Sequence, residues 1–289
     1  IIIMLCAATG FYYQSTYFLL FTLFALGTQA TFFGPLKYAI LPDHLHQDEL
    51  IAGNGLIEAG TFMAILLGTI LGGILVMQTY GEFIISAAII LFAISGWISS
   101  CFIPKASLPD SSLSVNYNFI VETKKLLTYA MDRRDLFLCI LGISWFWLVG
   151  AVFLAELPVF AKAALHANEH VVTFFLAIFS IGLAAGSVLC NRLLNGKIHA
   201  GFVPFAVLFI TVFILDLCYA SSDAITASAH SLVDLTSFLW TFTGWRISFD
   251  LLVIAICGGL YTIPLYAILQ TRSEESHRAR VIASNNVFN

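Results

Sequence analysis

The feature that most constrains this chain is a series of apolar runs, most of them about 20 residues or longer and almost free of charge. A helix needs about 20 apolar residues to cross the hydrocarbon core of a bilayer. Charged residues make up only 10% of the 289 residues, whereas soluble domains carry roughly 25%. The runs are continuously apolar and do not alternate with polar residues, which excludes a transmembrane β-barrel. We therefore expect an all-α polytopic membrane protein.

Polar breaks divide the chain into eight predicted spans and the start of a ninth. The spans cover about 1–12, 17–42, 50–78, 83–104, 136–163, 170–195, 200–220 and 248–271, and 280–289 opens the next. Because the first run is short and the chain begins with three isoleucines, we expect an internal piece of a longer protein. The six cysteines are scattered along the runs without a ligand spacing, so they are read as small apolar residues.

The longest connections between spans predict two surface elements. In 105–135, apolar residues recur at helical spacing beside Lys124 and Lys125, which predicts a helix on the membrane surface. If this segment is cytoplasmic, strict alternation leaves only Lys162 and Arg246 on the opposite side, a strong positive-inside asymmetry. The segment 221–244, which contains Asp223, Asp234 and several aromatic residues, is predicted to be an interfacial cap.

A short motif, Pro-Leu-(Lys)-Tyr-Ala-Ile-Leu, ends two different spans in the same direction. The first copy begins at Gly34 and Pro35, and the second runs from Ile263 to Leu269. Each copy is followed by a polar loop and an Ile-Ala-x-Asn sequence that ends at Asn54 in the first case and at Asn285 in the second. Parallel internal repeats in polytopic membrane chains indicate a transporter built from a duplicated unit.

Charged residues inside spans are the first candidates for a functional site, because each costs a few kcal/mol or more unless it is paired or hydrated. Lys37, present only in the first copy of the motif, either reaches the membrane surface or lines a cavity that accepts an anion. Asn54 and Glu58 share one helix face, so Glu58 either pairs with Lys37 as a gate or belongs to the translocation path. Glu156 is a candidate contact for a headgroup or a proton.

Asp216 and Asp250 fall near the ends of their predicted spans, where hydration is cheap, so the sequence does not favour either as a site residue. Small residues also recur every four positions in two spans, a pattern typical of close helix packing. These residues are Gly60, Ala64, Gly68 and Gly72 in 50–78 and Gly182 and Gly186 in 170–195.

The sequence offers no sign of a catalytic or metal centre. His166 and His170 are four residues apart, but no third ligand lies nearby and they belong to a loop. No catalytic or nucleotide-binding motif is present, and no basic patch interleaved with aromatic residues would bind nucleic acid. We expect no enzyme activity, cofactor or metal in this region.

Several motifs resemble a known family. The run from Gly186 to Arg192, followed by Gly196-Lys197, resembles the G-x-L-x-D-R-x-G-R-K loop of the major facilitator superfamily, with Asn191 in place of the acidic residue. Three further runs are similar to the bacterial lysophospholipid transporter branch of that superfamily, namely Gly34 to Pro42, Asn54 to Ala59 and Leu66 to Gly73. The run from Arg278 to Asn286 looks most like members fused to a phospholipid acyltransferase and an acyl-acyl carrier protein ligase.

The resemblance implies two six-helix bundles that rock around a midplane cavity. It implies that the chain covers about helices three to ten and the start of eleven. The N-terminal bundle would end within 1–104, a cytoplasmic linker with an amphipathic helix would occupy 105–135, and an incomplete C-terminal bundle would occupy 136–289. On this mapping 17–42 and 248–271 are helices four and ten, while 50–78 and 170–195 are helices five and eight, whose glycine stripes would let them slide against each other.

The same resemblance implies flipping of lysophospholipids across the bacterial inner membrane by alternating access, which would supply reacylation by a fused or partner acyltransferase. The 26 phenylalanines suit a path for an acyl chain among membrane lipids. We expect Lys37 to contact the phosphate, with Glu58 and Glu156 as polar partners. Two alternatives stay open, a drug or metabolite efflux transporter of the same superfamily and a membrane anchor for a fused acyltransferase.

Overall fold

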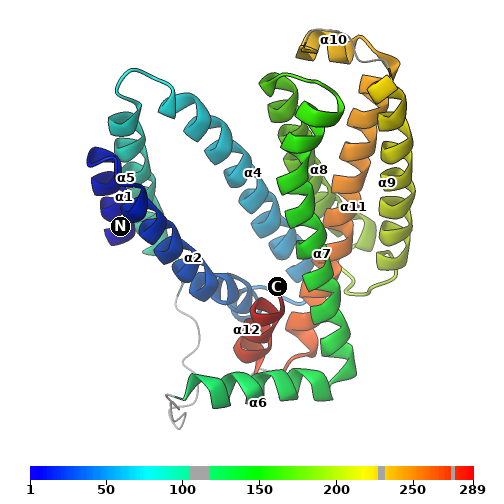
Figure 1. Ribbon diagram of the computed structural model, residues 1–289. Coiled ribbons are helices and arrows are strands. Elements are labelled where there is room, and N and C mark those ends of the chain that lie inside the picture. Colours follow the sequence, from blue (N-terminus) through cyan, green and yellow to red (C-terminus); the bar gives the residue numbers. More distant parts are fainter. Residues whose placement is uncertain (105–117, 227–231, 275–276) are drawn as a thin grey trace.

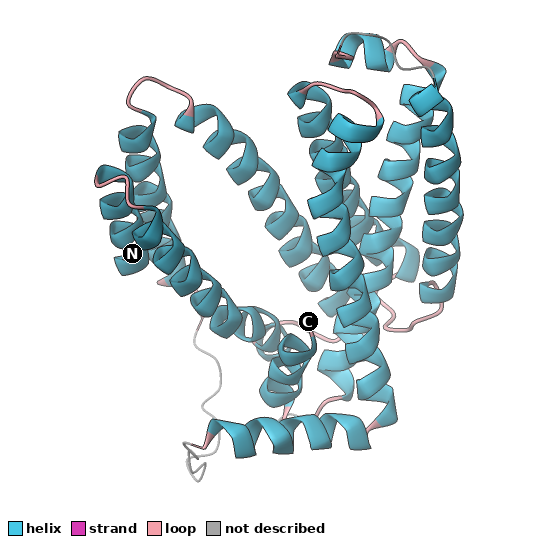
Figure 2. Cartoon of the chain, in the orientation of Figure 1, coloured by secondary structure: helices cyan, strands magenta, loops and turns pink. Residues whose placement is uncertain are grey.

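The computed structural model describes residues 1–104, 118–226, 232–274 and 277–289, with helices joined by loops (Figure 2). Seven helices within these ranges are long and apolar enough to cross a membrane. The elements in chain order are α1 (Ile2–Tyr12), α2 (Thr16–Ala39), α3 (Leu41–His44), α4 (Leu50–Val76), α5 (Gly81–Ser100), α6 (Phe119–Asp132), α7 (Arg134–Val159), the π-helical turn η1 (Phe160–Ala164), α8 (Glu169–Leu194), α9 (Val203–Thr226), α10 (Leu235–Leu239), α11 (Phe242–Arg272) and α12 (Arg278–Phe288).

Polar residues at the breaks start several of these helices. The side chain of Ser15 accepts a hydrogen bond from the Phe18 amide at the start of α2, and that of Thr241 accepts one from Gly244 at the start of α11. Asn168 caps α8 in the same way. Such caps satisfy backbone amides that have no partner inside the helix, so the polar breaks in the sequence help to fix where α2, α8 and α11 begin.

The helices form two arms that meet at one end (Figure 1). Figure 1 shows α1, α2, α4 and α5 in the first arm and α7, α8, α9 and α11 in the second, and the first turns of α4 pack on α8 where the arms meet. Figure 1 shows the arms converging where α6 and α12 lie, which we call the α6 end, and diverging towards the opposite end. The helix expected in the linker is α6, while the preceding residues 105–117 lie outside the described residues.

The second arm holds most of the buried core, which is centred on α11. Apolar side chains of α7, α8 and α9 surround α11, and every residue from Tyr261 to Gln270 is buried. In the first arm most large apolar side chains, such as Phe24 and Phe32, are exposed. Apolar surface of this kind is expected of helices that face lipid rather than water.

The glycine stripes pack differently from the expectation. A Cβ atom on Gly182 or Gly186 would meet α11 atoms at 2.6 and 2.1 Å, so these glycines let α8 approach α11 rather than α4. A Cβ on Gly68 or Gly72 would meet nothing within 4 Å. Among the described residues Gly68 and Gly72 therefore have no helix packed against them, because α4 diverges from α8 beyond its first turns (Figure 1). The contact of α4 with α8 is made instead at Gly55.

The predicted cap at 221–244 is in part a continuation of a membrane helix. Helix α9 runs on to Thr226, and only α10, capped by Asp234, stands as a separate short helix. The side chain of Asp223 lies outside the described residues. The aromatic residues Trp240, Phe242 and Trp245 are exposed at this end of the second arm.

Candidate functional site

The two candidate charges of the first arm, Lys37 on α2 and Glu58 on α4, lie in one cluster without touching. The Lys37 ammonium donates a hydrogen bond to the Thr61 hydroxyl at 3.3 Å and lies 4.7 Å from the ring centre of Tyr38. The Tyr38 hydroxyl in turn donates to Glu58, which is only 1% exposed. Among the ion pairs of the described residues, none joins Lys37 to Glu58, so the expected salt bridge is replaced by a tyrosine between the two charges.

Tyr38 also meets its counterpart from the second copy of the motif. The rings of Tyr38 and Tyr266 are stacked with their centres 4.3 Å apart and their planes 10° from parallel. The Trp147 indole donates a hydrogen bond to the Tyr266 hydroxyl at 3.1 Å. The two copies of the repeat therefore face each other where the arms converge.

A pair of buried amides joins the arms beside the tyrosines. The Asn54 amide donates to the Gln270 side-chain oxygen at 2.6 Å, and the Gln270 amide donates back to the Asn54 oxygen at 3.0 Å. Gln270 donates a second bond to the Tyr38 carbonyl at 2.9 Å. That carbonyl lacks the usual helical donor, because the residue four positions later is Pro42, which has no N–H. We call Tyr38, Asn54, Glu58, Tyr266 and Gln270 the crossing cluster.

A second proline creates a second link between the arms. Pro35 lies inside α2 and cannot donate to the Thr31 carbonyl. The Asn286 amide of α12 donates to this carbonyl at 3.5 Å and lies 2.8 Å from where a Cβ of Gly34 would be. Gly34 and Pro35 thus allow a contact with α12. Gly34 leaves room for the Asn286 side chain, and Pro35 leaves the Thr31 carbonyl free to accept its hydrogen bond.

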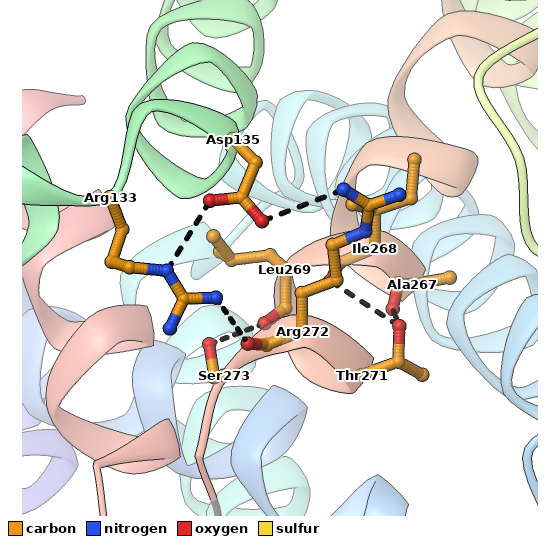
Figure 3. A network of polar contacts seen from close by, with 8 residues as sticks. All are labelled: Arg133, Asp135, Ala267, Ile268, Leu269, Thr271, Arg272 and Ser273. Carbon is orange, nitrogen blue, oxygen red and sulfur yellow. Dashed lines mark hydrogen bonds and ion pairs between the residues drawn. The ribbon is translucent and has the colours of Figure 1, made fainter.

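Charged residues at the α6 end surround the crossing cluster on its polar side. Arg278 donates to the Gln270 carbonyl at 3.0 Å and reaches Asp43 at 3.6 Å, so it ties α12 to α11 and α3. Figure 3 shows the neighbouring network, in which Asp135 of α7 lies 3.5 Å from both Arg133 and Arg272. Both arms also line a cavity of about 610 Å³ through Gln47, Asp48, Gly196, Lys197, Ile198, Ile268, Thr271 and Arg272.

The family model described as Major Facilitator Superfamily matches residues 1–289. The chain belongs to the major facilitator superfamily.

Curated relatives of this superfamily match most of the chain at low identity. The chain is 26% identical over 262 residues to lysophospholipid transporter LplT of Citrobacter koseri, and the match covers 89% of this chain. It is 27% identical over 266 residues, 90% of this chain, to the proteins of the same name from Escherichia coli and Shigella sonnei. The matches span only 58% to 59% of the relatives' length. No solved structure matches this chain.

The superfamily fold explains the arrangement of the arms. The two arms are consistent with part of the two-bundle fold of this superfamily. Membership of this superfamily, together with the seven candidate spans of the described residues, makes this a multi-pass membrane chain from a family of transporters. The crossing cluster lies where the two arms converge.

The structure does not bring every predicted site residue to the crossing cluster. Glu156 is exposed and lies on α7 nine residues beyond Trp147, which is about 13 Å of helix rise. Arg192, in the last turn of α8, is exposed as well. Among the described residues there is no group of three potential metal ligands, and His166 and His170 have no third partner.

Sequence reasoning missed Tyr38, Tyr266 and Gln270, although a signal for them was present. Both tyrosines belong to the repeated motif, and repeat-related residues meet wherever two halves face each other across an axis of pseudo-symmetry. Gln270 follows the second copy at the end of an otherwise apolar run. A buried amide in that position needs partners, and only the tertiary structure shows that Asn54 and the Tyr38 carbonyl provide them.

Proposed function

We propose that this chain is the transporter region of a protein that moves lysophospholipids across the bacterial inner membrane by alternating access. In this proposal the α6 end is cytoplasmic, and the substrate is released there to a fused or partner acyltransferase for reacylation. The proposal builds on membership of the superfamily and on the similarity to proteins named lysophospholipid transporters.

The observation that carries the proposal is the environment of Lys37. Its side chain is half-buried, it makes no ion pair among those described, and its hydrogen bond goes to a neutral hydroxyl. A cation in a membrane helix requires an anion or water, because an isolated charge there is costly. A phosphate diester would supply that anion and accept hydrogen bonds from both the ammonium and Thr61.

The acyl chain of the substrate has a matching surface on the same helices. Phe33 and Leu36 are exposed apolar side chains close to Lys37 in the sequence of α2. Leu56, in the first turns of α4, is exposed as well. Their apolar surface is compatible with an acyl chain that stays in contact with membrane lipid while the headgroup contacts Lys37. A substrate with one charged end and one apolar tail suits this combination better than a sugar, which would need many polar contacts.

The crossing cluster would act as the cytoplasmic gate. Its hydrogen bonds and its tyrosine stack join the bundles where the arms converge. To release substrate at the α6 end these contacts would have to break, since the arms diverge only at the other end. Asn54 is then a gate residue rather than a substrate ligand, and Glu58 positions Tyr38 at the gate through the hydrogen bond between them.

The test is uptake of labelled lysophosphatidylethanolamine into spheroplasts that contain the full-length protein. A charge-assisted hydrogen bond is worth about 1.5–3 kcal/mol, so Lys37→Met should lower uptake about 10- to 150-fold, since a tenfold change corresponds to about 1.4 kcal/mol. Lys37→Arg should retain most uptake. Lys162→Met is a matched control, because Lys162 is exposed and pairs with Glu169 outside the cluster.

The same assay separates the alternatives. Wild-type uptake in Lys37→Met would remove Lys37 from the headgroup site. No uptake by the wild-type protein, together with drug sensitivity of a deletion strain, would favour efflux by the same superfamily. No uptake and no drug phenotype, with loss of acyltransferase from the membrane in the deletion strain, would favour an anchoring role. Glu156→Gln should leave uptake within about twofold, because Glu156 is remote from Lys37 along the helix.

A further inference from the structure

A second group of charged residues lies inside the second arm, far from Lys37. Arg246, one turn into α11, donates from Nε to Asp216 of α9 at 2.9 Å and makes a second bond to the other oxygen of that carboxylate. The guanidinium also lies 5.2 Å from the ring centre of Tyr219. Both charged side chains are partly accessible, with 29% of Arg246 and 35% of Asp216 exposed. The pair joins α9 to α11.

Asp250 is a second carboxyl group in contact with this pair. Its side chain interacts with that of Asp216, yet its Oδ2 is buried without a hydrogen-bond partner. The sequence had placed Asp250 near a span end, but α11 begins at Phe242, so Asp250 lies about 12 Å along the helix. It is 1% exposed, so cheap hydration is not available to it.

The charges of these three residues do not balance. Two ionised carboxylates and one guanidinium sum to one negative charge, held between helices in the membrane. Two carboxylates in contact also cannot hydrogen-bond each other, because an ionised carboxylate only accepts. One bound proton removes the net negative charge of the three residues, and it turns one carboxyl into a hydrogen-bond donor to the other.

We propose that Asp216 and Asp250 share a single proton, and that these residues with Arg246 form a proton-binding site between α9 and α11. Because the two carboxyl groups interact, the proton belongs to the pair rather than to either residue. The proton would enter and leave through Asp216, whose side chain is partly exposed.

The surroundings of Asp250 contain few other ionisable groups. The charges that act on it are those of Asp216 and Arg246. Helix α8 packs on α11 with Gly182 against Ala255, and the ionisable residues of α8, namely Glu169, His170, Cys190 and Arg192, all lie eight or more residues from Gly182. On α7, Glu156 is exposed, and the side chain of Asp223 on α9 lies outside the described residues.

The site is mechanically connected to the crossing cluster through α11. Asp250 lies near one end of this helix, and Tyr266 and Gln270 lie near the other. A change of charge that alters how α11 packs on α9 would therefore act on the gate through one continuous helix. We infer that substrate movement is coupled to proton movement at this site, a step that rests on the proposed transport function.

The proton site can be tested without any substrate. Infrared difference spectra of the purified full-length protein between acidic and alkaline pH report the carbonyl stretch of a protonated carboxyl group. We expect a band of this kind that is lost in Asp250→Asn. It should also be lost in Asp216→Asn, because Asp250 could then pair with Arg246 and remain ionised. Glu58→Gln is the matched control, since Glu58 is the other buried carboxyl group of the described residues, and it should leave the Asp250 band in place.

Other outcomes would overturn the proposal. A band lost in Glu58→Gln and unchanged in Asp250→Asn would place the proton at the crossing cluster. Absence of the band, with sodium-dependent protection of the protein against unfolding, would mean that a metal cation balances the charge. Coupling is a separate measurement, in which an imposed pH gradient should change the rate of lysophosphatidylethanolamine uptake several-fold in the wild type and not in Asp250→Asn. Failure of this second measurement alone would leave the proton site standing and remove the coupling.

Discussion

The amide pair of the crossing cluster gives the sharpest prediction, because one substitution removes several contacts between the bundles. Gln270→Leu keeps the volume of the side chain and deletes the two bonds with Asn54 and the bond to the Tyr38 carbonyl. A buried hydrogen bond contributes about 1 kcal/mol net, so the closed gate should lose about 3 kcal/mol. The Asn54 side chain and the Tyr38 carbonyl, left without partners, can bind water when the gate opens, so their hydration also favours the open gate.

The size of the effect follows from the number of bonds. A loss of about 3 kcal/mol shifts the equilibrium between closed and open gates about 150-fold, since each 1.36 kcal/mol is a factor of ten. Asn54→Leu removes its bonds with Gln270 but leaves the bond from Gln270 to the Tyr38 carbonyl. It should therefore cost about 2 kcal/mol. The double substitution should cost less than the sum, because two apolar side chains leave fewer unsatisfied groups than one.

The assay is a distance measurement between spin labels at Gln47 and Lys197, which line the cavity from opposite bundles. In the full-length protein, with its native cysteines replaced, the wild type should give mainly the short distance and Gln270→Leu mainly a longer one. Thr271→Val is the matched control, because the Thr271 hydroxyl bonds only to carbonyls of its own helix. A distance distribution that is unchanged by Gln270→Leu in folded protein would refute the assignment of this pair as a gate.

Three further predictions concern packing, the Tyr38 hydroxyl and a helix cap. Gly186→Leu should lower the free energy of unfolding by at least about 3 kcal/mol, because the new side chain forces α8 away from α11. Gly68→Leu should change it by less than about 0.5 kcal/mol. Thermal unfolding measures both, and similar losses in the two variants would contradict the packing described. A double-mutant cycle of Tyr38→Phe and Glu58→Gln, read by the same spin-label distance, should give a coupling of about 1–3 kcal/mol, and strict additivity would argue against the bond between them. Hydrogen bonds from the residues after Asp234 lower the pKa of its carboxyl to about 2. The stabilisation of α10 by this cap should therefore be complete above the unfolded pKa near 4 and lost as the pH falls through about 2. Amide hydrogen exchange in α10 should show this pH dependence in the wild type and not in Asp234→Asn.

The membrane architecture could be predicted from the sequence because it depends on local composition. The lengths of the apolar runs set the spans, and the polar breaks set their ends, so the boundaries of α4, α7 and α8 fall close to those expected. The repeated motif also identified the segments that matter, since both copies lie where the bundles meet. Lys37 and Glu58 stood out because charge is rare in a membrane helix.

The pairing of helices could not be read from the same patterns. The stripe that contains Gly68 looks like that of Gly182, yet only the second has a helix against it. Which face of a helix is covered depends on the tilt of its neighbours, and a stripe of small residues permits a close approach without specifying the partner. For the same reason Asp250 looked harmless in sequence, and the packing of α9 on α11 makes it the most enclosed carboxyl of the second arm.

The sequence by itself determined that this protein lies in a membrane as a bundle of helices, because hydrocarbon leaves a long apolar chain no other way to satisfy its backbone. It also determined where charge and proline interrupt those helices. The tertiary structure alone decided what those interruptions meet. The carbonyls freed by Pro35 and Pro42 are bonded by Asn286 and Gln270, which lie more than 200 residues away in the chain. Contacts between bundles depend on how the two repeats fold onto each other, and no local pattern contains that information.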